Sequence, residues 1–245
     1  MSARRVAGLL LLVLGVMSNA AAAPAPRVLG PAERVDGKRV DAYPALWWQW
    51  VNRKRWGATA FQDPTGAQCA LNQSGPVWFL AGTDGTDEFH RRCRVPSGKH
   101  VFLPVVTMIE NAPAGDTRTC AQLKAEAADN NDHLVVTEVS VDGVAIDVRP
   151  LRMASGECFN GNAFSDYLKD GGAGYRSATD GYWLMLAPFA DGQHSLRVNV
   201  RYDNPGAEVG DMEQVFDYEL EVGGEEPSPP PPEPDEDDGP EWRQA

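Results

Sequence analysis

Short segments in which apolar and polar side chains alternate recur through this 245-residue chain. Residues 134–146 hold an Asp142-Gly143 pair between two such runs, and that pair is the strongest short-range signal for a β-hairpin. Residues 194–202 and 214–222 alternate in the same way. At least six strands, turn signals about every ten residues and no βαβ rhythm predict a mostly β fold. We expect an antiparallel, jelly-roll-like β-sandwich with one or two short peripheral helices.

The stretch 75–111 is expected to form the centre of this fold. Residues 77–81 have the continuous hydrophobicity of a strand buried on both faces, and residues 101–109 form a longer strand in which Pro104 indicates an edge or a bulge. A Gly-rich loop between them carries the following polar side chains: Asp84, Asp87, Glu88, His90, Arg91 and Arg92. We therefore expect two core strands that present one charged loop, which returns to the core at Cys93.

The two ends of the chain differ in composition from the middle. Arg4, Arg5, a following apolar run and a cluster of small residues have the pattern of a cleavable signal peptide. The apolar run has about eleven residues, which is too few to span a bilayer. The last segment combines many prolines with eight acidic residues. We expect a signal peptide (1–22), an extended leader (23–40), one β-sandwich domain (41–224) and a disordered acidic tail (225–245).

The expected export of the chain decides how its four cysteines are interpreted, namely Cys69, Cys93, Cys120 and Cys158. An even number of cysteines in an oxidising compartment favours disulfides, and three pairings are possible. We favour Cys69–Cys93 and Cys120–Cys158 because each closes a local loop, which is worth up to about 4 kcal/mol in the chain-entropy model. A zinc site is disfavoured because no two cysteines lie two to four residues apart.

The formal net charge of −13 argues against nucleic acid or an anionic membrane surface as a partner. The mature chain has no second apolar run of membrane length, so we expect a soluble periplasmic or secreted protein without a membrane span. The oligomeric state does not follow from these features.

Residues 41–51 predict a short helix, with Asp41 as its cap and Pro44 in its first turn. Tyr43, Trp47, Trp50 and Val51 share one face of it, and we expect that face to dock against a sheet. Aromatic rings that lie off such a core face can stack on sugar rings. The candidates for carbohydrate binding are Trp48, Trp56, Tyr175 and Tyr182.

Two further constellations carry possible chemistry. Asp84, Asp87 and Glu88 offer closely spaced oxygen ligands of the kind that calcium prefers, although the full acidic pattern of an EF-hand loop is missing. Glycoside hydrolysis needs two facing carboxylates, and Glu110 with Asp84 or Glu157 is the candidate pair. The four histidines have no Gly-x-Ser-x-Gly motif to partner them, so catalysis is not the favoured expectation.

Several stretches together resemble a group of exported bacterial proteins without an assigned activity. The stretches are WWQW at 47–50, DPTG at 63–66, GPVWFLAGT at 75–83, RCRVPSGK at 92–99, VDG at 141–143, GYW at 181–183 and DGQHSL at 191–196. The resemblance covers about residues 45–222 and implies one exported β-rich domain in which Cys69 and Cys93 belong to the pattern. It implies no catalytic residues. We therefore expect a binding module for a carbohydrate or a cell-envelope ligand, with a polymer hydrolase or a structural protein of the envelope as alternatives.

Overall fold

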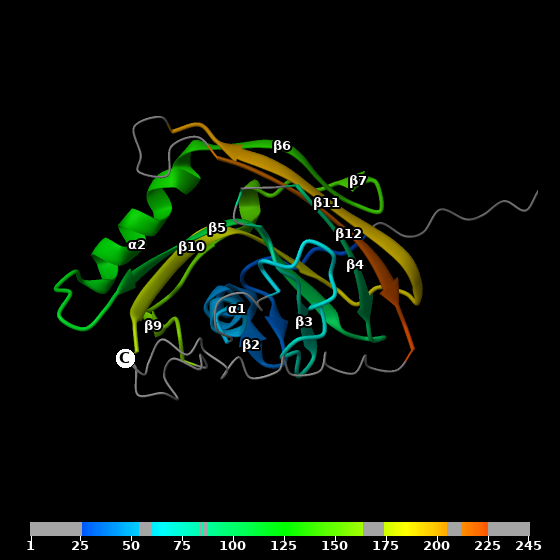
Figure 1. Cartoon of the computed structure of the whole chain (residues 1–245), viewed down its shortest axis with the longest axis horizontal. Helices are drawn as coiled ribbons and strands as arrows, with labels where there is room; N and C mark the ends of the chain where they lie inside the picture. Colours follow the sequence, from blue (N-terminus) through cyan, green and yellow to red (C-terminus); the bar gives the residue numbers. More distant parts are fainter. Residues whose placement is uncertain are drawn as a thin grey trace, which may run out of the picture.

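The computed structural model describes residues 26–53, 60–83, 85, 88–163, 174–204 and 212–224. In these residues the protein is mostly β, with two short α-helices and open sheets. Figure 1 shows two curved sheets facing each other, with α1 on the far side of the sheet that contains β5 and β10. The expected signal peptide and the expected acidic tail lie outside the described residues.

The first sheet lies between two other layers. Its strand order is β3 (Val77–Phe79), β5 (His100–Ala112), β10 (Arg176–Leu186) and β8 (Arg152–Ala154), and β9 (Phe159–Asn160) also pairs with β10. Leu103 and Leu184 belong to the core shared with the second sheet, whereas Phe102 and Trp183 belong to a second core shared with α1. Because both faces are covered, β5 and β10 show long apolar runs rather than an alternating pattern.

The expectation for Pro104 is confirmed. The register between β5 and β10 shifts between Tyr182 and Trp183, which places a bulge next to Pro104. β3 pairs with β5 only as far as Phe102, so the missing N–H of Pro104 faces no partner strand there.

The second sheet has the order β4 (Phe89–Val95), β12 (Met212–Val222), β11 (Gly192–Tyr202), β6 (Leu134–Val141) and β7 (Val144–Ala145). The predicted hairpin at residues 134–146 is confirmed as β6 and β7. Its two turn residues, Asp142 and Gly143, have φ angles of 51° and 74°, as a tight hairpin turn requires. The predicted alternation along β11 is also confirmed, because Leu196, Val198 and Val200 are buried.

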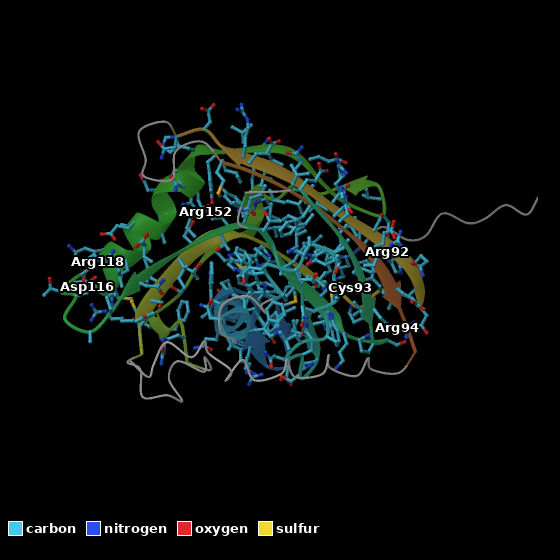
Figure 2. The ribbon with its side chains drawn as sticks, in the orientation of Figure 1. Arg92, Cys93, Arg94, Asp116, Arg118 and Arg152 are labelled. Carbon is cyan, nitrogen blue, oxygen red and sulfur yellow. A yellow bond between two sulfur atoms is a disulfide. The ribbon has the colours of Figure 1, made fainter. Side chains whose placement is uncertain are left out.

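Two features of the sheets correct the sequence-based expectation. β4 runs parallel to β12 and β3 runs parallel to β5, so the sheets are mixed rather than antiparallel. The charged loop expected up to Arg92 is also shorter than expected, because His90, Arg91 and Arg92 lie within β4. Figure 2 shows Arg92 and Arg94 on the outside with Cys93 between them turned toward the interior, in line with the alternating burial along this strand.

Residues 26–40 belong to the fold rather than forming only an extended leader. Leu29 donates its backbone N–H to the carbonyl of Met185 at 2.8 Å. Two short strands, β1 (Arg34–Val35) and β2 (Lys38–Arg39), form a hairpin, and η1 (Val40–Ala42) follows. Leu29, Val35 and Val40 are buried in the core that α1 shares with the first sheet, so the packed part of the chain begins before residue 41.

The helix α1 (Tyr43–Val51) packs on the first sheet through the predicted face. Trp47 Nε1 donates to the carbonyl of Leu80 at 2.8 Å, and its ring meets Trp183 edge to face at 5.4 Å between centroids. The predicted cap is wrong: the residue before the helix is Ala42, and Asp41 pairs with Arg39 instead.

The helix α2 (Cys120–Asp129) covers one end of the two sheets and is followed by η2 (Asn130–His133). Between β7 and β8, η3 (Arg149–Leu151) makes one further short turn. Both predicted disulfides are present, Cys69–Cys93 between the loop before β3 and β4, and Cys120–Cys158 between α2 and the segment before β9. Among the described helices, none is long and apolar enough to cross a membrane.

Candidate functional site

A cavity of about 300 Å³ opens between α1, the β1–β2 hairpin and the segment that leads into β3. Its apolar wall is formed by Tyr43, Leu46, Trp50 and Phe79. Tyr43 and Trp50 are almost fully buried, whereas Leu46 and Phe79 are half-buried. The volume is at the lower end of the range for ligand pockets, about 300–1,000 Å³.

Hydrogen bonds hold the aromatic wall in place. Tyr43 Oη donates to the carbonyl of Val35 at 2.9 Å, and Trp50 Nε1 donates to the carbonyl of Leu71 at 2.9 Å. The Trp50 and Phe79 rings lie 5.5 Å apart between centroids. The wall is therefore positioned before any ligand arrives, which lowers the cost of binding.

The rim of the cavity is polar and is made by α1, the β1–β2 hairpin and the loop before β3. It is lined by Asp36, Lys38, Gln49, Asn72 and Ser74. Asp36 and Asn72 have φ angles of 50° and 54°, a region in which Asn and Asp are the side chains best tolerated. Gln73 ties the same loop to β3, because its Nε2 donates to the carbonyl of Phe79 at 2.7 Å and its Oε1 accepts the backbone N–H of Phe79 at 3.0 Å.

The aromatic residues predicted for carbohydrate binding do not line this cavity. Trp48 is half-buried and its Nε1 donates to Thr179 Oγ1 at 2.8 Å, on the other side of α1 from the pocket. Tyr182 is half-buried with the Arg152 guanidinium 5.8 Å from its ring centroid. Tyr175 is half-buried beside Asn162, whose Oδ1 accepts its backbone N–H at 3.0 Å. Trp56 lies outside the described residues.

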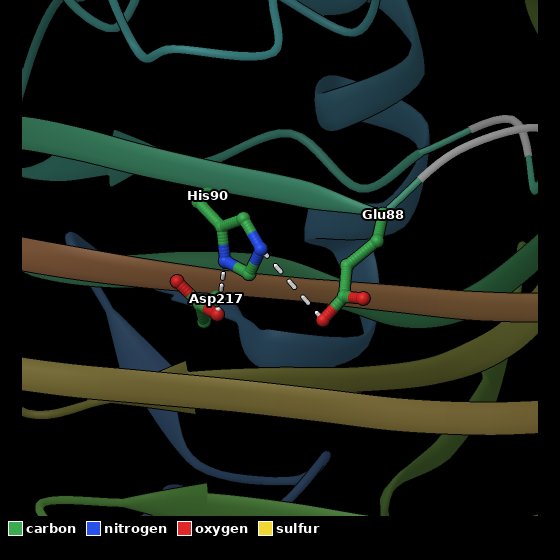
Figure 3. Close-up of side chains that lie close together, drawn as sticks. All are labelled: Glu88, His90 and Asp217. Atoms are coloured by element: carbon green, nitrogen blue, oxygen red, sulfur yellow. Dashed lines mark hydrogen bonds and ion pairs between the residues drawn. The ribbon is translucent and has the colours of Figure 1, made fainter.

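A second group of side chains meets on the outer face of β4 and β12 (Figure 3). His90 Nδ1 lies 2.7 Å from Asp217 Oδ2, and His90 Nε2 lies 3.8 Å from Glu88 Oε1. All the potential ligand atoms lie within 4.8 Å of one another. The same Asp217 Oδ2 also lies 3.6 Å from Arg197 Nη1.

The predicted calcium site is only partly within the described structure. Asp84 and Asp87 lie outside the described residues, so nothing tests their contribution. Glu88 is described, its side chain is 49% exposed, and its Oε1 lies 3.8 Å from His90 Nε2.

The carboxylates considered for hydrolysis have other partners. Glu110 lies 3.1 Å from Arg118 Nη1, and Arg118 also pairs with Asp116 and Glu126. Figure 2 shows Asp116 and Arg118 together near one end of α2. Hydrogen bonds from Arg118 lower the pKa of Asp116 below its ordinary value. Glu110 is thus part of an arginine-centred ion cluster, and Glu157 is exposed in the segment before β9.

Sequence reasoning missed a buried polar network around Asp180 in β10. Asp180 Oδ1 accepts hydrogen bonds from Asn131 Nδ2 at 2.9 Å and from Arg152 Nε at 2.8 Å. Tyr202 Oη donates to Asn131 Oδ1 at 2.8 Å. Burial raises the pKa of Asp180, and the positive charge of Arg152 acts in the opposite direction. The network joins η2 to β8, β10 and β11, so its role is structural. The signal in the sequence that could have revealed it is an acidic residue within an apolar strand.

Comparisons of this chain with protein-family models, with curated proteins and with solved structures give no match. The resemblance to a group of exported bacterial proteins therefore stays a prediction.

Proposed function

We propose that the protein binds a small carbohydrate, or a cell-envelope molecule that contains one, in the cavity between α1 and β3. The observation that carries this proposal is the combination of an aromatic wall with a ring of hydrogen-bonding side chains. Sugar rings have apolar faces that pack on aromatic and aliphatic groups and hydroxyl groups that need polar partners. Leu46, Trp50 and Phe79 supply the first kind of surface. Asn72, Ser74 and the side-chain oxygen of Gln49, whose Nε2 donates to the carbonyl of Asn160, supply the second.

The same scaffold supports binding better than the alternatives. The two disulfides fit an oxidising, extracytoplasmic compartment, where glycans of the envelope are found. Two facing sheets that share one core support a β-sandwich, while the parallel pairs β3–β5 and β4–β12 depart from the order of a jelly roll. For a hydrolase, the described contacts of Glu110 with Arg118 offer no catalytic pair.

Titration of the purified protein with a panel of mono- and disaccharides, followed by NMR or calorimetry, tests the proposal. Two tryptophans of α1 provide matched variants. Trp50→Phe shrinks the pocket wall and should weaken binding between about twofold and tenfold, as the loss of about 0.5–1.5 kcal/mol of aromatic contact predicts. Trp48→Phe removes a hydrogen bond to Thr179 outside the pocket and should leave the affinity within about twofold.

A rim variant makes the test independent of the aromatic wall. Asn72→Gly keeps a residue that accepts a positive φ angle while it removes the side-chain amide, so the loop should keep its shape and lose affinity. Equal affinities for Trp48→Phe and Trp50→Phe would place binding elsewhere. Absence of any signal across the panel and across a glycan array would overturn the proposal.

A further inference from the structure

On the outer face of β4 and β12, three basic side chains of β4 lie opposite three acidic side chains of β12. The two strands are parallel and in register, so His90 lies beside Asp217, Arg92 beside Glu219 and Arg94 beside Glu221. Arg92 and Arg94 each pair with their neighbour, at 2.7 Å and 3.1 Å. The first pair, here called the first rung, differs, because it holds an imidazole and because a second carboxylate, Glu88, faces its other ring nitrogen.

We propose that this first rung is a binding site for a divalent transition-metal ion of the zinc class, with His90 Nε2 and the Glu88 carboxylate as its protein ligands. Asp217 has the role of a positioning residue. A metal-bound imidazole commonly directs its other ring nitrogen, as an N–H, to a carboxylate, which fixes the ring and strengthens the ligand. Asp217 Oδ2 lies 2.7 Å from Nδ1, the nitrogen that faces away from Glu88, and therefore meets this condition (Figure 3).

The distance between the two ligand atoms suits such an ion. Nε2 and Oε1 are 3.8 Å apart. Bonds of about 2.0–2.2 Å at a tetrahedral angle require a separation of about 3.4 Å, so Glu88 needs to move by only a few tenths of an ångström. The side chains of His90 and Glu88 are 64% and 49% exposed, which leaves room for this movement and for water molecules in the remaining coordination positions.

The donor set also selects the class of metal. Calcium takes six to eight oxygen ligands and magnesium keeps an octahedral oxygen shell, whereas imidazole nitrogen favours zinc, copper and nickel. One nitrogen and one carboxylate oxygen at this spacing therefore indicate a zinc-class ion. The three side chains of this rung belong to β4, β12 and the residue before β4, whereas the proposed carbohydrate pocket lies at α1 and β3.

Arg197 gives the site a second testable property. Its Nη1 lies 3.6 Å from Asp217 Oδ2, and its Nε donates to Glu138 at 3.2 Å. A positive charge this close to the site opposes the approach of a cation. Replacement of Arg197 with Gln should therefore strengthen metal binding about two- to fivefold at low ionic strength, and added salt should reduce the difference.

Calorimetric titration of the full-length protein, without an affinity tag, with Zn²⁺ tests the inference. Wild-type protein should bind one ion, and His90→Ala and Glu88→Gln should each weaken binding by at least about tenfold. Asp217→Asn should weaken it by up to about tenfold, as the loss of an orienting carboxylate predicts. Visible absorption of bound Co²⁺ should report a nitrogen ligand that disappears in His90→Ala.

His133→Ala is the matched control, because His133 is also exposed but ends η2 at a distance in the chain from this rung. It should leave Zn²⁺ binding unchanged. Equal affinities for wild-type protein and His90→Ala would overturn the inference and assign any bound ion to another surface. Displacement of Zn²⁺ by equimolar Ca²⁺ would also overturn it, because it would require an oxygen-only site.

Discussion

Arg91 lies in β4 with only 1% of its surface exposed. Its guanidinium donates to the carbonyl oxygens of Phe61, Asp63, Ala81 and Gly82 and to the hydroxyl of Tyr218, at 2.6–3.1 Å. It also lies 4.8 Å from the centroid of the Phe89 ring. A buried charge is tolerated only when its hydrogen-bonding capacity is used, and all three guanidinium nitrogens of Arg91 donate to these acceptors.

Substitution of Arg91 by Lys should destabilise the protein by about 3 kcal/mol, because a lysine has three donors and would leave several buried carbonyl groups unpaired. Arg92→Lys is the matched control. Its side chain is 83% exposed and pairs with Glu219, so the cost should stay below about 0.5 kcal/mol. Urea unfolding at neutral pH measures both. Similar costs for the two variants would show that the carbonyl cage contributes little.

The contrast between the buried Arg91 and the exposed Arg92 was not predictable from the sequence. The residue pattern Phe-His-Arg-Arg-Cys-Arg-Val reads as a charged loop because four of its seven side chains are polar. Inward and outward side chains alternate along this strand, but the sequence does not show it, because the inward position between Phe89 and Cys93 holds an arginine instead of an apolar residue. The acceptors that make that position acceptable come from other segments of the chain, namely the carbonyl groups of residues 61–63 and 81–82 and the hydroxyl of Tyr218.

At the scale of single elements, the strong local sequence patterns predicted the secondary structure correctly. The hairpin at Asp142-Gly143, the alternating β11 and the helix α1 all depend on neighbouring residues in the sequence. The parallel pairing of β4 with β12 depends on partners 127 residues apart. Its signal is nevertheless present, because basic residues at 90, 92 and 94 match acidic residues at 217, 219 and 221.

The start of α2 gives a prediction at this scale. Thr117 and Thr119 both precede this helix, and Thr119 is its cap because it forms a reciprocal capping box with Gln122. Thr119→Ala should therefore cost about 1 kcal/mol in the free energy of unfolding. Amide hydrogen exchange at Gln122 should accelerate in the same variant, because its backbone N–H loses its acceptor.

Thr117→Ala provides the comparison for this helix start. It removes a similar side chain two residues before the cap and should change stability by less than about 0.5 kcal/mol. If both alanine variants cost the same, the capping box would not be the source of the stabilisation.

At the scale of the whole molecule, the first sheet has a core on each face, and this arrangement explains which sites were predictable. The sequence indicated that the aromatic face of α1 docks on a sheet. It did not indicate that a cavity remains beside Trp50, because the cavity depends on where residues 36–38 and 72–76 come to lie. The meeting of His90 with Asp217 was hidden for the same reason.

The loop from residue 60 to residue 76 joins the two sheets. Thr65 accepts the backbone N–H of Arg92 at 2.9 Å, so this loop covers the open edge of β4. Gly66 allows the close approach, because a Cβ there would lie 2.4 Å from the carbonyl oxygen of Arg92. The Cys69–Cys93 disulfide fastens the loop to β4, next to the carbonyl groups that hold Arg91.

This arrangement predicts the relative importance of the two disulfides. In the chain-entropy model, Cys120–Cys158 stabilises the protein by about 4 kcal/mol and Cys69–Cys93 by about 3.5 kcal/mol, because the first disulfide spans 38 residues and the second spans 24. We expect the opposite order. Removal of Cys69–Cys93 by double serine substitution should cost more, since it also loosens the loop that supplies acceptors to Arg91 and covers the edge of β4.

Urea unfolding of the two double variants, each with and without Arg91→Lys, measures this coupling. The cost of Arg91→Lys should shrink by about 1 kcal/mol when Cys69–Cys93 is absent, because neighbouring groups in one network are not additive. It should stay unchanged when Cys120–Cys158 is absent, since that disulfide lies at α2, away from the loop. A larger loss of stability on removal of Cys120–Cys158 would show that loop closure, rather than attachment of the loop to β4, decides how this protein uses its disulfides.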